Sequence, residues 1–117
     1  MPAPDLTYLG NALPAEDRLS LYVATRLLGE LQSALHLIGL ATRYERPGAH
    51  GVEQPRLYVL RPTGEGPEEA VRVTTRTTHV PHSESWFEWE RENERICRTS
   101  DLPTATRLIA ERLSFRA

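Results

Sequence analysis

The sequence contains no lysine, so all 14 of its basic residues are arginine. It also lacks a strong net charge, because 16 acidic residues leave a formal charge of −2. A small net charge argues against duplex DNA or an anionic membrane as the dominant partner. No stretch approaches the roughly 18 uninterrupted apolar residues of a membrane-spanning helix. Arginine-only usage, with abundant Ala, Pro, Leu and Glu, suggests a GC-rich genome such as that of an actinobacterium.

Cysteine is nearly absent. Cys97 is the only cysteine, which excludes a disulfide within the chain and fits a reducing cytoplasm. The first residues, MPAPDLTYLGNALP, show no basic segment followed by an apolar core, so we expect no signal peptide and a cytoplasmic location. Arg95 and Arg98 flank the thiol and would favour a thiolate nucleophile, but a lone cysteine is more often a small core residue.

Aromatic residues are few, at 7% of the chain, whereas apolar residues make up 39% and charged residues 26%. That is the profile of a soluble globular domain. At 117 residues the chain has the size of one domain. The pattern predicts a flexible N-terminal arm over residues 1–13, where proline, glycine and asparagine gather, and a single α+β domain over 14–117.

A long helix is predicted between Pro14 and Gly39. Apolar residues recur there at steps of three and four and define one face, made of Leu19, Val23, Leu27, Leu31, Ala34, Leu35 and Ile38. Further apolar residues lie outside this stripe: Leu21, Tyr22, Ala24, Leu28 and Leu37. A helix that is apolar over most of its circumference is usually buried on more than one side. We therefore expect a homodimer, with Leu21, Tyr22 and Leu28 as candidate interface residues; cover by the arm or by a second helix is the alternative.

The middle of the chain predicts an antiparallel meander of four to five strands. Candidate strands are the short segment 40–45, RLYVLRP, AVRVTTRTTHV, SWFEWER and ERICR, separated by turns rich in proline, glycine and charged residues. In SDLPTATRLIAERLSF, Asp101 is a candidate N-cap of a terminal helix with one apolar face. Two end helices packed on one sheet face give a two-layer α/β sandwich of the α+β class.

Alternation along the strands assigns side chains to two faces of the sheet. Phe87 and Trp89 share one face and are expected in the core beneath the helices. The other face is expected to carry Tyr58, Leu60, Arg72, Thr74, Arg76 and Trp86. No remaining segment is predicted to cover it. The candidate binding residues are therefore Tyr58, Arg72, Arg76 and Trp86.

Residues with catalytic or metal-binding chemistry are scattered. His79 and His82 lie three apart, but Pro81 and the strand context place them in a turn, and a zinc site needs three or four ligands. A period-two series of glutamates is expected to form cross-strand ion pairs with arginines rather than an acid–base pair. These are Glu84, Glu88, Glu90, Glu92 and Glu94, opposite Arg72, Arg76, Arg95 and Arg98. No phosphate-binding loop, GxSxG or HExxH motif occurs. We expect no enzyme activity, no metal and no cofactor.

The stretch SWFEWERENERICRTSDLPTATRLIAERL, about a quarter of the chain, is similar to small actinobacterial proteins of unknown function. They share a helix, a β-meander with a tryptophan-rich strand, a tight return and a terminal Asp-capped helix. The order helix, meander, helix also resembles type III secretion chaperone-like folds. These resemblances imply a homodimer that binds other proteins and has a regulatory or interaction role, and they supply no catalytic residue.

Three functions remain open from the sequence. The first is a non-catalytic cytoplasmic protein-interaction module that acts as a small regulator, adaptor or chaperone-like protein. The alternative is a small-ligand or nucleotide-binding domain that uses the same sheet face, which would require a deep pocket there. The third is an enzyme that uses Cys97 or the histidines. A nucleic-acid partner is not expected, because the glutamates of the fourth strand oppose phosphate.

Overall fold

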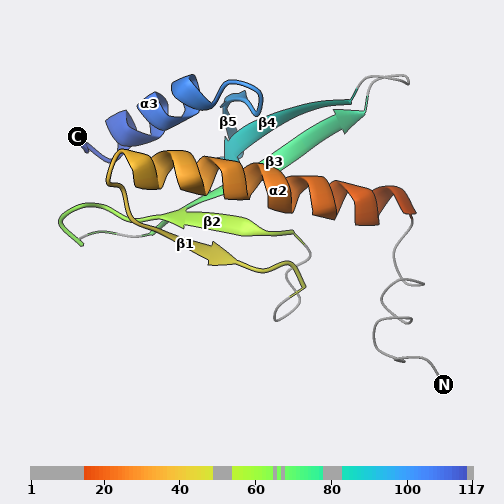
Figure 1. Ribbon diagram of the computed structural model, residues 1–117, viewed down its shortest axis with the longest axis horizontal. Coiled ribbons are helices and arrows are strands. Elements are labelled where there is room, and N and C mark those ends of the chain that lie inside the picture. Colours follow the sequence, from red (N-terminus) through yellow and green to blue (C-terminus); the bar gives the residue numbers. More distant parts are fainter. Residues whose placement is uncertain (1–14, 49–53, 65, 67, 78–82, 116–117) are drawn as a thin grey trace.

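The computed structural model describes residues 15–48, 54–64, 66, 68–77 and 83–115, with the backbone alone at 15–20, 75–77, 83 and 84. The elements follow in the order α2 (Ala15–Leu37), β1 (Thr42–Glu45), β2 (Arg56–Val59), β3 (Glu69–Thr77), β4 (Ser83–Trp89), β5 (Glu94–Arg98) and α3 (Leu102–Arg112). The five strands form one antiparallel sheet in sequential order. Both helices lie against it (Figure 1). The predicted α+β meander with flanking helices is confirmed. The expected arm over residues 1–13 lies outside the described residues.

The long helix α2 ends where the sequence predicts, at Gly39. This glycine has φ +95°, a left-handed conformation that favours a residue without a Cβ. Its N–H donates to the carbonyl of His36 at 2.9 Å, and the N–H of Leu40 donates to the carbonyl of Leu35 at 3.0 Å. This pair of bonds is a Schellman cap. Leu40 is then buried and turns the chain into β1.

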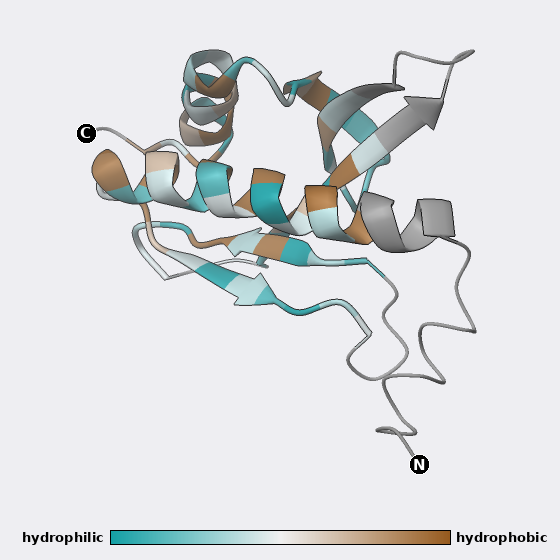
Figure 2. Cartoon of the chain, turned by 45° about the vertical axis from the view of Figure 1, so that its right-hand side comes forward, coloured by the Kyte–Doolittle hydropathy of each residue, from teal (hydrophilic) through white to brown (hydrophobic). Residues whose placement is uncertain are grey.

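The buried face of α2 differs from the predicted stripe. Its core residues are Ala24, Leu28, Leu31 and Leu35, which follow helical steps of four and three. Placing Ala24 and Leu28 outside the main stripe was wrong. The reason is that α2 contacts both the sheet and α3, so its buried side is set by two neighbours within the same chain. The brown and teal bands along α2 in Figure 2 show this division between apolar and polar residues.

The sheet contributes the other half of the core from alternate positions. Its buried side chains are Leu57, Val59, Val71, Val73, Phe87 and Trp89, and α3 adds Ala105, Ile109 and Leu113. Phe87 has no exposed surface and Trp89 has 5%. The prediction that these two aromatic residues of SWFEWER anchor the core is confirmed.

The terminal helix begins at the predicted cap. The carboxylate of Asp101 accepts a hydrogen bond from the N–H of Thr104 at 3.2 Å, which satisfies one of the unpaired donors at a helix start. Pro103 sits in the first turn, where its missing N–H costs nothing. A hydrogen bond with the Thr104 side chain, and then this backbone bond, lower the pKa of Asp101. Among the described residues, no helix is long and apolar enough to cross a membrane.

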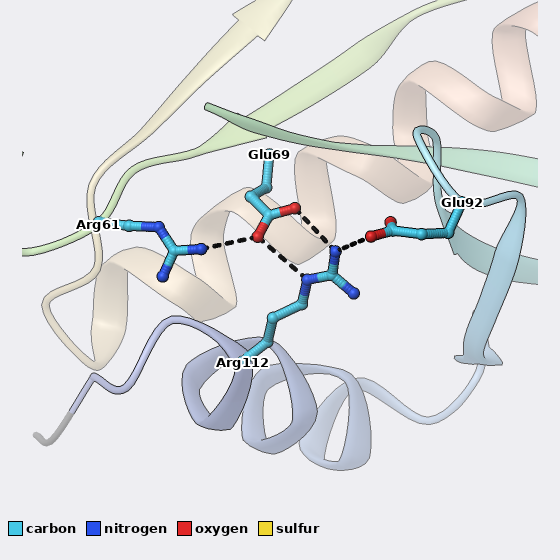
Figure 3. A network of polar contacts seen from close by, with 4 residues as sticks. All are labelled: Arg61, Glu69, Glu92 and Arg112. Carbon is cyan, nitrogen blue, oxygen red and sulfur yellow. Dashed lines mark hydrogen bonds and ion pairs between the residues drawn. The ribbon is translucent and has the colours of Figure 1, made fainter. Parts of the chain in front are cut away.

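A polar network joins α3 to the start of β3 (Figure 3). The Arg112 guanidinium donates to both carboxylate oxygens of Glu69, at 3.1 and 2.9 Å, and also contacts Glu92. Arg61 donates to Glu69 at 3.0 Å. The guanidinium of Arg112 also lies 4.3 Å from the ring centroid of Trp89. Glu69 is only 6% exposed, so this is a buried, multiply bonded carboxylate that closes the end of the core.

Candidate functional site

Both helices pack on one face of the sheet, and the opposite face is formed by the side chains that alternate with the core residues. We call it the open face. Its side chains are Arg43, Glu45, Arg56, Tyr58, Arg72, Thr74, Trp86, Glu88, Glu90, Arg95 and Arg98. The strand register sets them side by side, as in the pairs Arg43 with Tyr58 and Arg72 with Glu88. Three of the four predicted binding side chains, Tyr58, Arg72 and Trp86, therefore share this face. The backbone of Arg76 pairs with Glu84, and its side chain lies outside the described residues.

Trp86 is half-buried and stacks under arginine. The Arg95 guanidinium lies 3.9 Å from its ring centroid and that of Arg98 lies 5.9 Å away, both within the range of cation–π attraction. A register shift between β4 and β5 places Arg98 opposite Trp86 and Arg95 opposite Glu88. Strict alternation would put residues three apart on opposite faces. The bulge therefore brings both arginines to one tryptophan.

A second stacked pair lies at the other side of the open face. The Arg43 guanidinium lies 4.1 Å from the ring centroid of Tyr58. Arg43 also donates to Glu68 at 2.5 Å, and this carboxylate raises the pKa of the guanidinium. Tyr58 and Trp86 are thus each covered by an arginine.

Ion pairs tie the middle of the open face together. Arg72 donates to Glu88 at 2.7 Å and also to the side-chain oxygen of Asn93. This confirms the predicted cross-strand pairing for Arg72 and Glu88. The Arg56 side chain lies 2.5 Å from a carboxylate oxygen of Glu90. Arg72, expected as a ligand-binding residue, is already paired within the chain.

Several residues of the open face were not predicted from the sequence. Arg43, Arg56 and Arg95 were not named as binding candidates, although all three lie on this face. The signal for Arg56 was present, because it stands two positions before Tyr58 on the same strand. Arg43 lies in the segment 40–45, where apolar and polar residues are mixed without a clear alternation. Arg95 depends on the bulge, which the sequence does not reveal.

The three candidate dimer residues of α2 have different fates. Leu28 has no exposed surface within the single chain, so it has nothing to offer a partner, and its assignment to an interface is corrected. It faces inward because it belongs to the stripe that packs on the sheet. Leu21 is half-buried. Tyr22 is 69% exposed and Leu37, at the other end of the helix, is 87% exposed.

Cys97 lies on the helix side of β5. Its backbone pairs with Phe87, and its side chain packs partly against the core. Burial raises the pKa of the thiol, and the nearby Asp101 carboxylate raises it further. The expectation that Arg95 and Arg98 favour a thiolate is corrected, because Arg95 stacks over Trp86 on the opposite face. The thiol instead donates to the carbonyl of Asp101 at 3.6 Å.

We expect Cys97 to react slowly with a disulfide reagent such as Ellman's reagent at pH 7.5. Because burial and Asp101 raise its pKa, its rate should be at least about tenfold below that of a free cysteine, whose pKa is about 8.5. Stopped-flow absorbance measures the rate, and the urea-unfolded chain serves as control and should react at the ordinary rate. If the reaction rate of the folded protein, measured as a function of pH, had its midpoint below about pH 7, the raised pKa would be contradicted.

The histidines give no metal centre in the part of the chain that the structure describes. There, no three His, Cys, Asp or Glu side chains gather closely enough to hold a metal ion. His36 lies on α2 and its ring nitrogen is hydrogen-bonded to the hydroxyl of Thr42 at 2.8 Å. His79 and His82, like His50, lie outside the described residues.

Two hollows lie away from the open face. One, of about 580 Å³, is formed between the end of α2 and the β2–β3 connection and is lined by residues such as Leu40, Leu60 and Phe115. The other lies beside Tyr44 and Thr25. Neither includes Tyr58, Arg72 or Trp86. Neither of these two hollows is therefore the pocket that a small-ligand site built from those side chains would need.

No protein-family model, no curated protein and no solved structure matches this chain.

Proposed function

We propose that this chain is a non-catalytic protein-interaction module that works in the cytoplasm as a small regulator, adaptor or chaperone-like protein. The open face is its binding surface. The observation that supports this most directly is the arginine-covered Trp86 on a sheet face where neither helix packs.

The residue types of this face are those that carry binding energy in protein interfaces. Tryptophan, tyrosine and arginine are enriched among the residues whose truncation weakens a complex most. The open face holds aromatic and arginine side chains in contact, with Arg95 on Trp86 and Arg43 on Tyr58. A partner side chain that replaces water over these stacks would bury the surface of an aromatic ring. The arginine stacked on that ring already holds it in place.

The ion pairs between the stacks support the same role. Arg72 with Glu88, and Arg56 with Glu90, hold long side chains in fixed positions. Binding then loses less side-chain entropy than it would on a surface of free arginines and glutamates. The alternating charges also give the face a specific pattern that a partner must match.

The homodimer and the resemblance to chaperone-like folds belong to the same proposal. We infer a homodimer as the working form, which the resemblance to chaperone-like folds also implies. The open face does not depend on this assembly, because its contacts all lie within one chain.

Affinity capture from the native cell extract tests the open face. The bait proteins are wild type, Trp86→Ala, Arg95→Ala and the control Glu111→Gln, which changes an exposed carboxylate of α3 that lies outside the open face. We expect one partner to be retained by wild type and control and reduced at least about tenfold by Trp86→Ala, as for a residue that dominates an interface. Circular dichroism verifies that each bait is folded. Equal recovery of every partner by all four baits would contradict the proposal.

A further inference from the structure

The two most exposed large apolar side chains of the described residues lie on the same helix. Tyr22 and Leu37 are 69% and 87% exposed, and both belong to α2. Between them, at helical steps, lie the exposed residues Arg26 and Ser33 and the partly exposed Gly29. These five positions form one stripe on the side of α2 opposite its buried residues. Fifteen residues separate its ends, which is about 22 Å of helix.

The glycine in this stripe has no explanation within the described part of the chain. A Cβ added to Gly29 would meet no atom of the described residues within 4 Å, so no contact among them requires a residue without a side chain there. Glycine in the interior of a helix is less favourable than alanine. The bare backbone at Gly29 would be useful only for close approach from outside the chain.

The stripe is complementary to itself in the antiparallel sense. Tyr22 and Leu37 lie at equal distances along α2 from the point midway between Gly29 and Glu30. Arg26 and Ser33 are also equidistant from that point. A two-fold axis through this point would therefore set Tyr22 of each copy beside Leu37 of the other, as an isologous interface requires.

Charge follows the same symmetry. Arg26 and Glu30 form a loose, exposed ion pair within one helix, at 3.8 Å. In the antiparallel arrangement, Arg26 of one copy lies within one helical turn of the level of Glu30 of the other, a distance that an arginine side chain spans. Two ion pairs across the interface then replace two within the helices. Glu30 itself passes over the bare backbone of Gly29.

We propose that a second copy of this chain docks on the stripe Tyr22–Arg26–Gly29–Ser33–Leu37 and forms an antiparallel α2–α2 homodimer. This deepens the homodimer part of the proposed function and leaves the open face of each copy free. One helix stripe is a small interface, and small interfaces give weak, reversible complexes, so we expect a dissociation constant of roughly 10 to 100 μM.

A charge exchange tests the pairing. Arg26→Glu and Glu30→Arg chains each set like charges across the interface, and their self-association should weaken by about tenfold. An equimolar mixture should regain the wild-type constant, because both ion pairs form again in the heterodimer. Sedimentation equilibrium measures all three samples. The matched control is the exchange of the α3 pair Arg107 and Glu111, which is equally exposed and should leave self-association unchanged.

The orientation is tested by cross-linking. Tyr22→Cys and Leu37→Cys chains, mixed and oxidised, should give a disulfide that joins position 22 of one chain to position 37 of the other. Peptide mapping separates this product from any bond to Cys97. Predominant bonds between identical positions would overturn the antiparallel arrangement.

Gly29→Ala gives two effects of opposite sign. In dilute, monomeric protein it should raise the thermal midpoint by roughly 3 to 5 °C, because alanine favours the helix. In concentrated protein it should weaken self-association at least about fivefold, because the added methyl group lies at the closest approach. A purely structural glycine would not separate these two readouts.

The results of these experiments separate a failure of the α2 stripe from a failure of homodimer formation as such. A wild-type chain that stays monomeric up to roughly 300 μM, above the expected range for so small an interface, overturns both the homodimer and the stripe. A dimer that ignores the charge and glycine variants overturns the stripe alone and leaves a dimer through another surface. Neither result bears on the open face, which is tested by capture.

Discussion

Phe87→Ala is expected to lower the free energy of unfolding by about 3–5 kcal/mol, the usual cost of removing a large aromatic side chain from a packed core. Phe87 has no exposed surface, and its strand lies between β3 and β5, in the inner part of the sheet. The neighbouring core positions, Val73 across β3 and Cys97 across β5, cannot fill the cavity without moving their strands. The measurement is a urea unfolding curve followed by circular dichroism.

The adjacent residue supplies the control for this experiment. Trp86→Ala removes a side chain of greater volume from the open face, where it is only half-buried and stacked by Arg95. We expect a loss of roughly 1–2 kcal/mol, from the cation–π contacts of Trp86 and its partial burial. If Phe87→Ala does not fold, Phe87→Leu should still lose more stability than Trp86→Ala. Equal losses at the two positions would contradict the division of SWFEWER between two faces.

Glu69→Gln is expected to destabilise the domain by about 3 kcal/mol, because it leaves buried arginine charge without its carboxylate. Arg112 makes two hydrogen bonds to Glu69 and Arg61 makes a third. Glutamine can accept from only one of its two terminal atoms, so at least one guanidinium donor is lost. Glu111→Gln is the matched control: its pair with Arg107 is about 60% exposed on both sides, and its loss should cost less than about 0.5 kcal/mol.

The contribution of Glu69 to the stability of the folded domain should also depend on pH. The hydrogen bonds from Arg112, and then the charges of Arg112 and Arg61, lower the pKa of Glu69 from its usual value near 4.5. A carboxylate with a lowered folded pKa stabilises fully above its unfolded pKa and loses this stabilisation as the pH falls through the folded pKa. The stability difference between wild type and Glu69→Gln should therefore be constant near pH 7 and shrink below about pH 4.5. A difference that grows on acidification would contradict this sign.

Much of the fold was accessible from local patterns. The end of α2 at Gly39, the Asp101 cap and the inward aromatic residues Phe87 and Trp89 were all predicted from spacing and residue type. Each depends on interactions within a few residues, or on the period-two alternation of a strand. Such features are written in consecutive positions and do not require knowledge of distant partners.

The orientation of α2 was predicted less well for a physical reason. The helix is apolar over much of its circumference, so periodicity alone does not say which positions turn inward. Ala24 and Leu28 became core residues because the sheet and α3 both approach that side. The same packing left Tyr22 and Leu37 exposed, which moved the candidate interface away from Leu28.

The candidate site shows the same division. Alternation placed Tyr58, Arg72 and Trp86 on one face, but it did not place Arg95 and Arg98 together on Trp86, because that depends on the register shift in β5. For Cys97 the sequence left two interpretations, a thiolate favoured by Arg95 and Arg98 or a small core residue. The folded strand packs the side chain partly against the core and turns Arg95 to the opposite face.

The sequence by itself determined the elements, their order, the α+β class and the two faces of the sheet, because these follow from short-range periodicity and capping. Only the tertiary structure decided which charges meet. Arg112 and Glu69 are 43 positions apart, and their contact exists only because α3 returns to the start of β3. The arginines and glutamates can be identified in the sequence, but their partners cannot. Electrostatic interaction depends on distance in space, and the packing of the whole domain sets that distance.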